Sequence, residues 1–200
     1  MSRLLLVLLG LTLTVLGLFV EVPWPFVAPP GAVPEGARVA FHLGEWAAGT
    51  APWTLQALGP WFAGLALPPV QAGTSMVLWL VACLAGAPWA ESSRGPAMLA
   101  GPAFGFQAGM VVQAVVIAAL ARGGRPSGRF MALLAGQAVC WAIGAAWLAA
   151  RGQEPMPVLA AQLAGSPGWF IAWAVVAWLP TLIGRRPKPQ PRQDAPQVIR

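Results

Sequence analysis

The chain has few charged residues and many apolar ones. Charged residues make up 9% of its 200 residues and hydrophobic residues 58%, against roughly 25% and 45–50% in a typical soluble domain. One small core could not bury this much apolar surface, so the composition excludes an ordinary soluble domain and places the chain in lipid. A helix needs about 20 apolar residues to cross the hydrocarbon, and this length therefore allows about six spans.

Residues that catalysis requires are equally scarce. The only histidine is His42, no acidic residue lies in the middle of an apolar segment, and neither Gly-x-Ser-x-Gly nor His-Glu-x-x-His occurs. Cys83 and Cys140 have no Cys or His nearby, which excludes zinc and redox motifs. The ATP-binding pattern Gly-x-x-x-x-Gly-Lys-[Ser/Thr] is also absent. We therefore predict no enzymatic activity, no catalytic or metal-ligating residue and no cofactor, and any ATP-driven step must come from separate subunits.

The net charge of +6 does not indicate nucleic-acid binding, because the cations flank the apolar segments and do not form a basic face with interleaved aromatics. Their distribution predicts an orientation instead. Three cations would lie on one side of the membrane (Arg38, Arg94 and Arg151) and nine on the other. The nine are Arg3, Arg122, Arg125, Arg129, Arg185, Arg186, Lys188, Arg192 and Arg200. By the positive-inside rule, both termini are then cytoplasmic.

Six apolar segments stand out: Leu4–Val22, Trp53–Leu67, Ala72–Ala87, Ala97–Ala121, Phe130–Ala150 and Gly168–Gly184. They should be helices, because lipid offers no partner for free backbone groups, and Pro68-Pro69 prevents the second and third from joining. Residues 1–184 are thus predicted to form the six-span domain of an all-α integral membrane protein, multi-pass in the cell membrane. Residues 185–200, rich in Pro, Gln and Arg, are predicted to be a disordered cytoplasmic tail.

The first apolar segment follows Arg3, as the h-region of a signal peptide would follow its basic residues. It is longer than a usual h-region, and Val20–Pro23 offers no small-x-small cleavage site. We therefore expect this segment to be retained as a span.

The connection at residues 23–51 is expected on the outer side. Its prolines indicate extended backbone in its first half, whereas Val39, Leu43, Trp46 and Ala47 share one helical face and predict a short helix. Such a helix would either lie on the membrane surface or form a lid over an outward-facing pocket. Both interpretations remain open.

A second short outer helix is predicted over Pro157–Ala164. The Ser166-Pro167-Gly168 sequence that follows is a strong helix start. The last span should therefore present free N–H groups, with partial positive charge, on the outer side.

Small residues and glutamines interrupt the apolar segments in a regular way. Two stripes have a small residue at every fourth position: Ala97, Gly101, Gly105 and Gly109, and then Ala132, Gly136, Cys140 and Gly144. They favour close helix packing, or, alternatively, let a flat ligand ring touch the backbone. The glutamines should face inward, either to bond between helices or to bind a polar ligand such as a cyclic urea; they are Gln56, Gln107, Gln113, Gln137 and Gln162.

Three motifs carry a resemblance to a known family. Thr54–Gly59 reads TLQALG, Gly101–Gly109 reads GPAFGFQAG, and Ser93-Arg94-Gly95 precedes the second. Their order and spacing resemble the BioY family, the biotin-capturing subunits of energy-coupling factor transporters. The resemblance implies the substrate-subunit fold of these transporters and capture of biotin, or a close analogue, from the outer face. It implies as partners membrane lipid, a transmembrane coupling subunit and two ATPase subunits.

The resemblance also implies the residues of a binding site. Arg94 would hold the biotin carboxylate, although a loop ion pair with Glu91 is the alternative for it. From their own chemistry we also predict ligand contacts by Gln56, Gln107 and Gln137 through their amides, by Gly101 and Gly105 through access to the ring, and by Gly168 and Trp169 at the start of the last span.

Two departures from the family pattern leave alternatives open. Relatives carry Asp and Lys at the start of the last span where this chain has Trp169 and Ala172, so the pocket loses a charged pair and gains an indole. The first segment lacks the Ala-xxx-Ala pattern expected for docking on the coupling subunit, and Gly10 and Thr14 are the nearest small pair. The alternatives are a binder of a different vitamin and a ligand-free membrane assembly protein.

Overall fold

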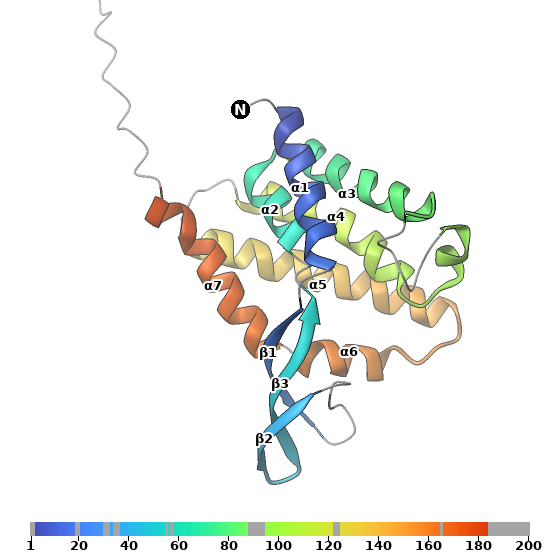
Figure 1. Ribbon diagram of the computed structural model, residues 1–200, viewed down its shortest axis with the longest axis vertical. Helices are drawn as coiled ribbons and strands as arrows, with labels where there is room; N and C mark the ends of the chain where they lie inside the picture. The colour runs from blue at the N-terminus through green and yellow to red at the C-terminus, as the bar shows by residue number, and fades with distance from the viewer. Residues whose placement is uncertain are drawn as a thin grey trace, which may run out of the picture.

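The computed structural model describes residues 3–18, 21–29, 33, 37–54, 56, 58–87, 95–121, 125–164 and 166–183. Most of them are helical (Figure 1). The helices are α1 (Arg3–Leu18), α2 (Leu58–Ala66), α3 (Pro69–Leu84), the 3-10 helix η2 (Gly95–Ala100), α4 (Phe104–Leu120), α5 (Pro126–Ala150), α6 (Pro155–Ala164) and α7 (Ser166–Ile183). The strands are β1 (Glu21–Ala28), β2 (Arg38–Leu43) and β3 (Trp46–Thr54). The predicted tail at residues 185–200 lies outside the described residues.

Each of the six apolar segments overlaps one of the helices α1, α2, α3, α4, α5 and α7, although α1, α3, α5 and α7 begin one to four residues before the predicted segment. The break at Pro68 is confirmed, because α2 ends at Ala66 and α3 begins at Pro69. The predicted short helix is confirmed as α6, and the predicted start of the last helix as Ser166 of α7. Within the described residues, one helix, α5, is by itself long and apolar enough to cross a membrane. The count of six spans therefore stays a prediction.

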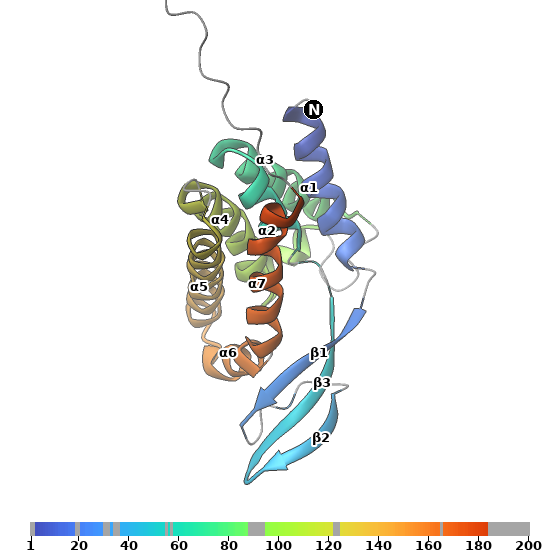
Figure 2. The same ribbon diagram turned by 90° about the vertical axis from the view of Figure 1, so that its left-hand side faces the viewer.

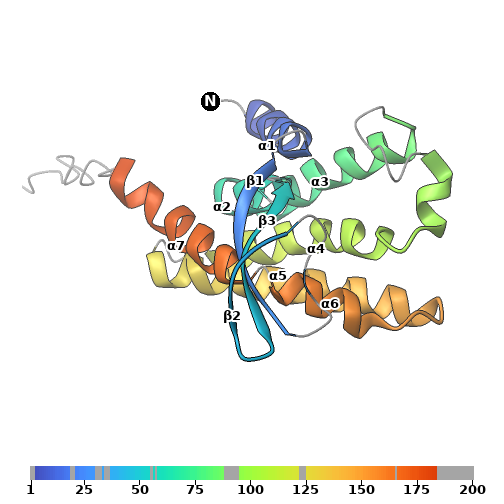
Figure 3. The same cartoon turned by 60° about the horizontal axis from the view of Figure 1, so that its bottom comes forward.

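Helices α3, α4 and α5 lie side by side (Figure 3). Helix α2 packs on α3 and α4, α1 packs on α2 and α3, and α7 packs on α5. Because α5 is long, the connections at its two ends lie at opposite ends of the bundle. At its start, Arg129 Nη1 donates to the Ala177 carbonyl oxygen at 3.5 Å and so ties α5 to the second half of α7. At its other end, Arg151 precedes α6.

A three-stranded antiparallel sheet of order β1-β3-β2 projects from the bundle (Figure 2). The extended backbone predicted after the first helix is confirmed over Glu21–Ala28, but the helix predicted over Val39–Ala47 is wrong, because this stretch forms strands. The fold is therefore mostly helical with one small sheet, and not purely α-helical as predicted. Part of the reason is the turn between β2 and β3. Gly44 adopts φ +63°, which a tight two-residue hairpin turn requires, and this turn pairs Leu43 with Trp46.

The two faces of the sheet differ in exposure. Phe26, Ala28 and Ala47 form a buried cluster on one face, with Ala37 packed against it, and β1 lies near α6 and α7. On the other face, Phe41 is 55% and Trp46 49% exposed. Aromatic side chains on this face therefore have little protein covering them within the described residues.

Helix α1 uses its small residues inside the bundle. Gly10 is buried with its Cα near Ser75, Thr14 is fully buried, and a Cβ at Gly59 would overlap the Thr14 side chain. The Ser75 hydroxyl donates to the Val7 carbonyl oxygen at 3.0 Å. The Gly10 and Thr14 pair therefore packs α1 on α2 and α3, and the outward face of α1 carries leucines instead.

Candidate ligand-binding site

The two stripes of small residues meet in the interface between α4 and α5. A Cβ added at Gly109 would lie 2.9 Å from the Cys140 carbonyl oxygen, and one at Gly136 would lie 2.6 Å from Ile117 Cγ1. These distances leave no room for a side chain. Close helix packing is therefore confirmed as the role of these positions, whereas access for a ligand ring stays a prediction for Gly101 and Gly105.

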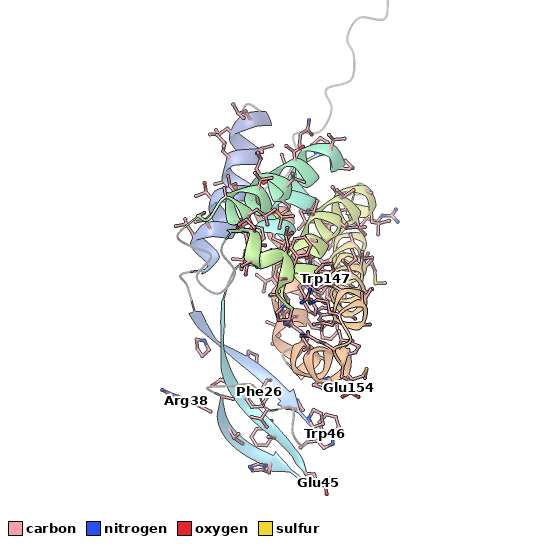
Figure 4. All side chains as sticks on the ribbon, turned by 90° about the vertical axis from the view of Figure 1, so that its right-hand side faces the viewer. Phe26, Arg38, Glu45, Trp46, Trp147 and Glu154 are labelled. Atoms are coloured by element: carbon pink, nitrogen blue, oxygen red, sulfur yellow. The ribbon has the colours of Figure 1, made fainter. Side chains whose placement is uncertain are left out.

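Trp147 of α5 fastens the turn that precedes α4. Its indole Nε1 donates a hydrogen bond to the Gly101 carbonyl oxygen at 3.0 Å, and its ring meets that of Phe104 edge-on, with 5.1 Å between centroids. Gly105 packs directly on it, since an added Cβ there would lie 2.8 Å from Trp147 Cγ. Figure 4 shows Trp147 within the helix bundle, away from the labelled residues of the sheet. One side chain thus fixes the whole segment from Gly101 to Gly105 against α5.

Arg151 extends this contact to the end of α5. Its guanidinium carbon lies 5.9 Å from the centroid of the Trp147 ring, one helical turn earlier in the chain. Arg151 is the C-cap residue of α5, a position where the free carbonyl groups of the helix favour a positive charge. Its side chain is exposed.

Two buried glutamines bond across the same interface. Nε2 of Gln113 on α4 donates to Oε1 of Gln137 on α5 at 2.8 Å, and the two side chains are 1% and 5% exposed. The prediction that membrane glutamines face inward is confirmed for this pair, as is bonding between helices. Gln137, which we also predict as a ligand contact, therefore has a partner inside the protein.

Gln56 and Gln107 lie near one face of α4. Gln56 Nε2 is 3.9 Å from the Met110 sulfur, a weak hydrogen bond. Gln107 lies three residues before Met110 and shares its face, and within the described residues its Oε1 is buried without a hydrogen-bond partner. A buried unpaired acceptor costs about 1–3 kcal/mol. A bound molecule with an N–H or O–H group could therefore donate the hydrogen bond that Gln107 Oε1 lacks.

Trp169, a predicted ligand contact, belongs to an aromatic cluster. Its side chain is 8% exposed, and its ring lies 5.1 Å from that of Trp61 and 6.2 Å from that of Trp173. Ile117 and Leu133 belong to the same cluster. The structure thus groups Trp169 with α2 and α7 rather than with Gly101 and Gly105. Gly168 precedes it in the first turn of α7.

The described part of the bundle contains no buried charge. Its buried polar side chains are those of Thr14, Ser75, Gln113 and Gln137, and its residues include no group of three or more His, Cys, Asp or Glu that could hold a metal ion. A ligand anion would therefore need a cation from the ends of the helices. The predicted one, Arg94, lies outside the described residues.

An apolar groove of about 370 Å³ lies elsewhere, between α3 and α4. Its lining residues are Pro69, Val70, Gly73, Thr74, Val77, Leu78, Val111 and Val115. None of them is a predicted site residue.

Comparison with known proteins gives two matches. A family model described as "BioY family" matches residues 35–186, which include both the TLQALG and GPAFGFQAG segments. A crystal structure described as the S-component for biotin from an ECF-type ABC transporter has a similar fold, with a TM-score of 0.63 and 18% sequence identity. The similarity covers 94% of this chain and 96% of that chain. No curated protein matches the sequence.

Proposed function

The chain belongs to the BioY family, and we propose that it is the substrate-binding membrane subunit of an uptake system for biotin or a close analogue. BioY proteins are subunits of transporters, so the chain is a transport protein and not an enzyme. The observation that carries the proposal is the family match over residues 35–186, more than half of the chain. The fold shared with a biotin S-component supports it.

The proposed protein crosses the membrane six times, with both termini in the cytoplasm, and captures its ligand from the outer face. The helices of the six apolar segments and the cation distribution support this arrangement. Arg125 and Arg151 lie at the two ends of α5. Their positions agree with this topology, because the cation distribution assigns Arg125 to the cytoplasmic side and Arg151 to the outer side.

We place the polar ring of the ligand against α4. A cyclic urea offers two N–H donors and one strong acceptor, which complement the amide of a glutamine. In the part of the chain that the structure describes, Gln107 Oε1 lacks a donor, and the acceptor of Gln56 is the weak one of the Met110 sulfur. Both amides would therefore gain a stronger hydrogen bond when the ring binds. Gly101 would allow the ring to approach the start of α4, whereas Gly105 would contribute only if Trp147, which packs on it, moved away.

The proposal assigns the ligand carboxylate to Arg94. Replacing Arg94 by Ala should weaken binding by about 1.5–3 kcal/mol, the range for a hydrogen bond to a charged group. Unchanged affinity would return Arg94 to a loop ion pair with Glu91.

Gly168 and Trp169 remain proposed contacts at the start of α7. Because the Trp169 side chain is 8% exposed, a ligand could stack on its indole only if the ring moved away from Trp61. The absence of the family's Asp and Lys at Trp169 and Ala172 favours a second candidate, a different vitamin with the same mode of capture.

The proposed partners are a transmembrane coupling subunit and two ATPase subunits, because the chain has no ATP-binding motif of its own. Docking on the coupling subunit would not use Gly10 and Thr14, which pack inside the bundle. The outward leucines of α1, among them Leu4 and Leu8, are available for this contact.

Two measurements on the purified protein test the function. Mass spectrometry of extracted small molecules should find biotin, and a thermal melt with a panel of vitamins should show stabilisation by biotin. A ligand at 100 times its Kd stabilises by about 2.7 kcal/mol, which for a chain of this size is about 5–10 °C. A shift with another vitamin would support the second candidate. No shift with any of them would support a ligand-free assembly protein.

A further inference from the structure

We propose that Arg151, held on the ring of Trp147, is a second cation for the carboxylate of the ligand. This inference rests on the proposed function, because it assumes that the ligand is a carboxylic acid. It adds a residue that the sequence motifs do not indicate.

The contacts of Trp147 fix where the Arg151 guanidinium lies. The indole is held by its hydrogen bond to the Gly101 carbonyl oxygen and by the ring of Phe104. The guanidinium carbon lies 5.9 Å from this ring. Arg151 is thereby placed beside the start of α4, where the GPAFGFQAG segment begins.

The guanidinium is also available to bind an anion. A guanidinium that rests on an aromatic face keeps its N–H groups free for a carboxylate. Arg151 is exposed, and in the part of the chain that the structure describes it makes no ion pair. Glu154 is exposed as well and lies near the start of α6 (Figure 4).

The spacing along α4 suits a ligand with a polar ring at one end and an acid at the other. Phe104 touches Trp147, whereas Met110 touches Gln56. These two residues of α4 are separated by a rise of about 9 Å, at about 1.5 Å per residue. Gln107 lies three residues after Phe104 and shares its face of α4. The acid tail of a ring bound at Gln107 can therefore extend along this face toward Phe104 and Trp147, and so toward Arg151.

An exposed arginine such as Arg151 can supply the positive charge that the described interior lacks. The buried side chains of the described residues include no cation, so nothing within the described interior can neutralise a carboxylate. A carboxylate accepts from two guanidinium groups because it has two oxygens and about four lone-pair sites. Arg151 can therefore bind this carboxylate whether or not a second cation also binds it.

The test compares biotin with biotinamide, in which the acid tail is uncharged, by titration calorimetry. The full-length wild type should prefer biotin, and Arg151→Gln should weaken biotin binding about tenfold, or about 1.4 kcal/mol, with the affinity for biotinamide unchanged. Arg125→Gln is the matched control, because Arg125 is an exposed arginine at the opposite end of α5. It should change neither affinity.

Two variants of Trp147 test the role of its ring. Trp147→Phe keeps an aromatic face under the guanidinium and should keep most of the preference for biotin. Trp147→Leu removes that face and should reduce the preference as Arg151→Gln does. Equal preference in Trp147→Leu and wild type would overturn the positioning role.

The outcomes separate this inference from the proposed function. If Arg151→Gln binds biotin as tightly as the wild type, or loses biotin and biotinamide equally, the inference is wrong and the function stands. If the wild type binds biotin and biotinamide equally, the inference is likewise wrong. If the wild type binds neither, the proposed function fails and takes the inference with it.

Discussion

The bond between Gln113 and Gln137 offers a prediction that separates packing from ligand binding. Gln137→Leu leaves the Gln113 amide without its acceptor at a side chain that is 1% exposed. Hydrogen bonds between membrane helices are worth about 0.6–2 kcal/mol, and an orphaned buried donor costs about 1–3 kcal/mol. We therefore expect the free energy of unfolding to fall by about 1–3 kcal/mol, and by a similar amount in Gln113→Leu.

A double-mutant cycle measures this interaction. In the Leu-Leu double variant no amide is orphaned, so its loss of stability should be smaller than the sum of the two single losses by about 1–2 kcal/mol. Gln71→Leu is the control, because the Gln71 Oε1 atom is buried without a partner within the described residues. It should be neutral or stabilising.

The same variants decide between the two roles of Gln137. If its amide serves only the helix interface, biotin affinity should change equally in Gln113→Leu and Gln137→Leu. A selective loss in Gln137→Leu would show a ligand contact. If the stability losses of Gln113→Leu and Gln137→Leu simply add in the double variant, the hydrogen bond between the two side chains does not stabilise the fold.

Three further predictions concern topology, packing and the aromatic cluster. Cysteines introduced at Gly36 and Gln190 should be labelled from the outer and the inner side respectively, and an outer signal at Gln190 would contradict cytoplasmic termini. Gly105→Leu should destabilise the protein by several kcal/mol, because the added side chain would overlap Trp147; a wild-type melting curve would refute that packing. Trp169→Ala should cost about 3–5 kcal/mol, since the indole packs on Trp61, and a loss below about 1 kcal/mol would contradict its burial.

The helices follow from the sequence because lipid permits few backbone structures. Long apolar runs must be helical there, and Pro68 and Ser166 mark helix boundaries by their own chemistry. These local signals need no knowledge of the partner helix. The structure accordingly places α2, α3 and α7 at the predicted segments.

The sheet was missed because one pattern fits two structures. Val39, Leu43 and Trp46 fall on one face of a helix, yet Leu43-Gly44-Glu45-Trp46 is also a hairpin sequence, with glycine where positive φ is needed. Pairing with β1, more than ten residues away, decides between them. Periodicity within a short window does not contain that information.

Two further features, the attachment of Trp147 to Gly101 and the direction in which Gly10 and Thr14 face, depend on contacts between distant segments and cannot be predicted from the sequence. The hydrogen bond from Trp147 to Gly101 joins residues 46 positions apart, and no local pattern predicts it. The spacing of four between Trp147 and Arg151 is the one available signal, since such residues meet on a helix. The direction in which Gly10 and Thr14 face likewise depends on α2 and α3.

Biotin binding is tested most directly by calorimetric titration of the purified protein, held in nanodiscs, with biotin. A biotin-binding subunit should show saturable binding of one biotin per chain and competition by a close analogue with an intact urea ring, and Gln107→Leu should bind biotin more weakly. The absence of saturable heat at millimolar biotin, from protein that shows a cooperative thermal melt, would contradict the assignment as a biotin-binding subunit.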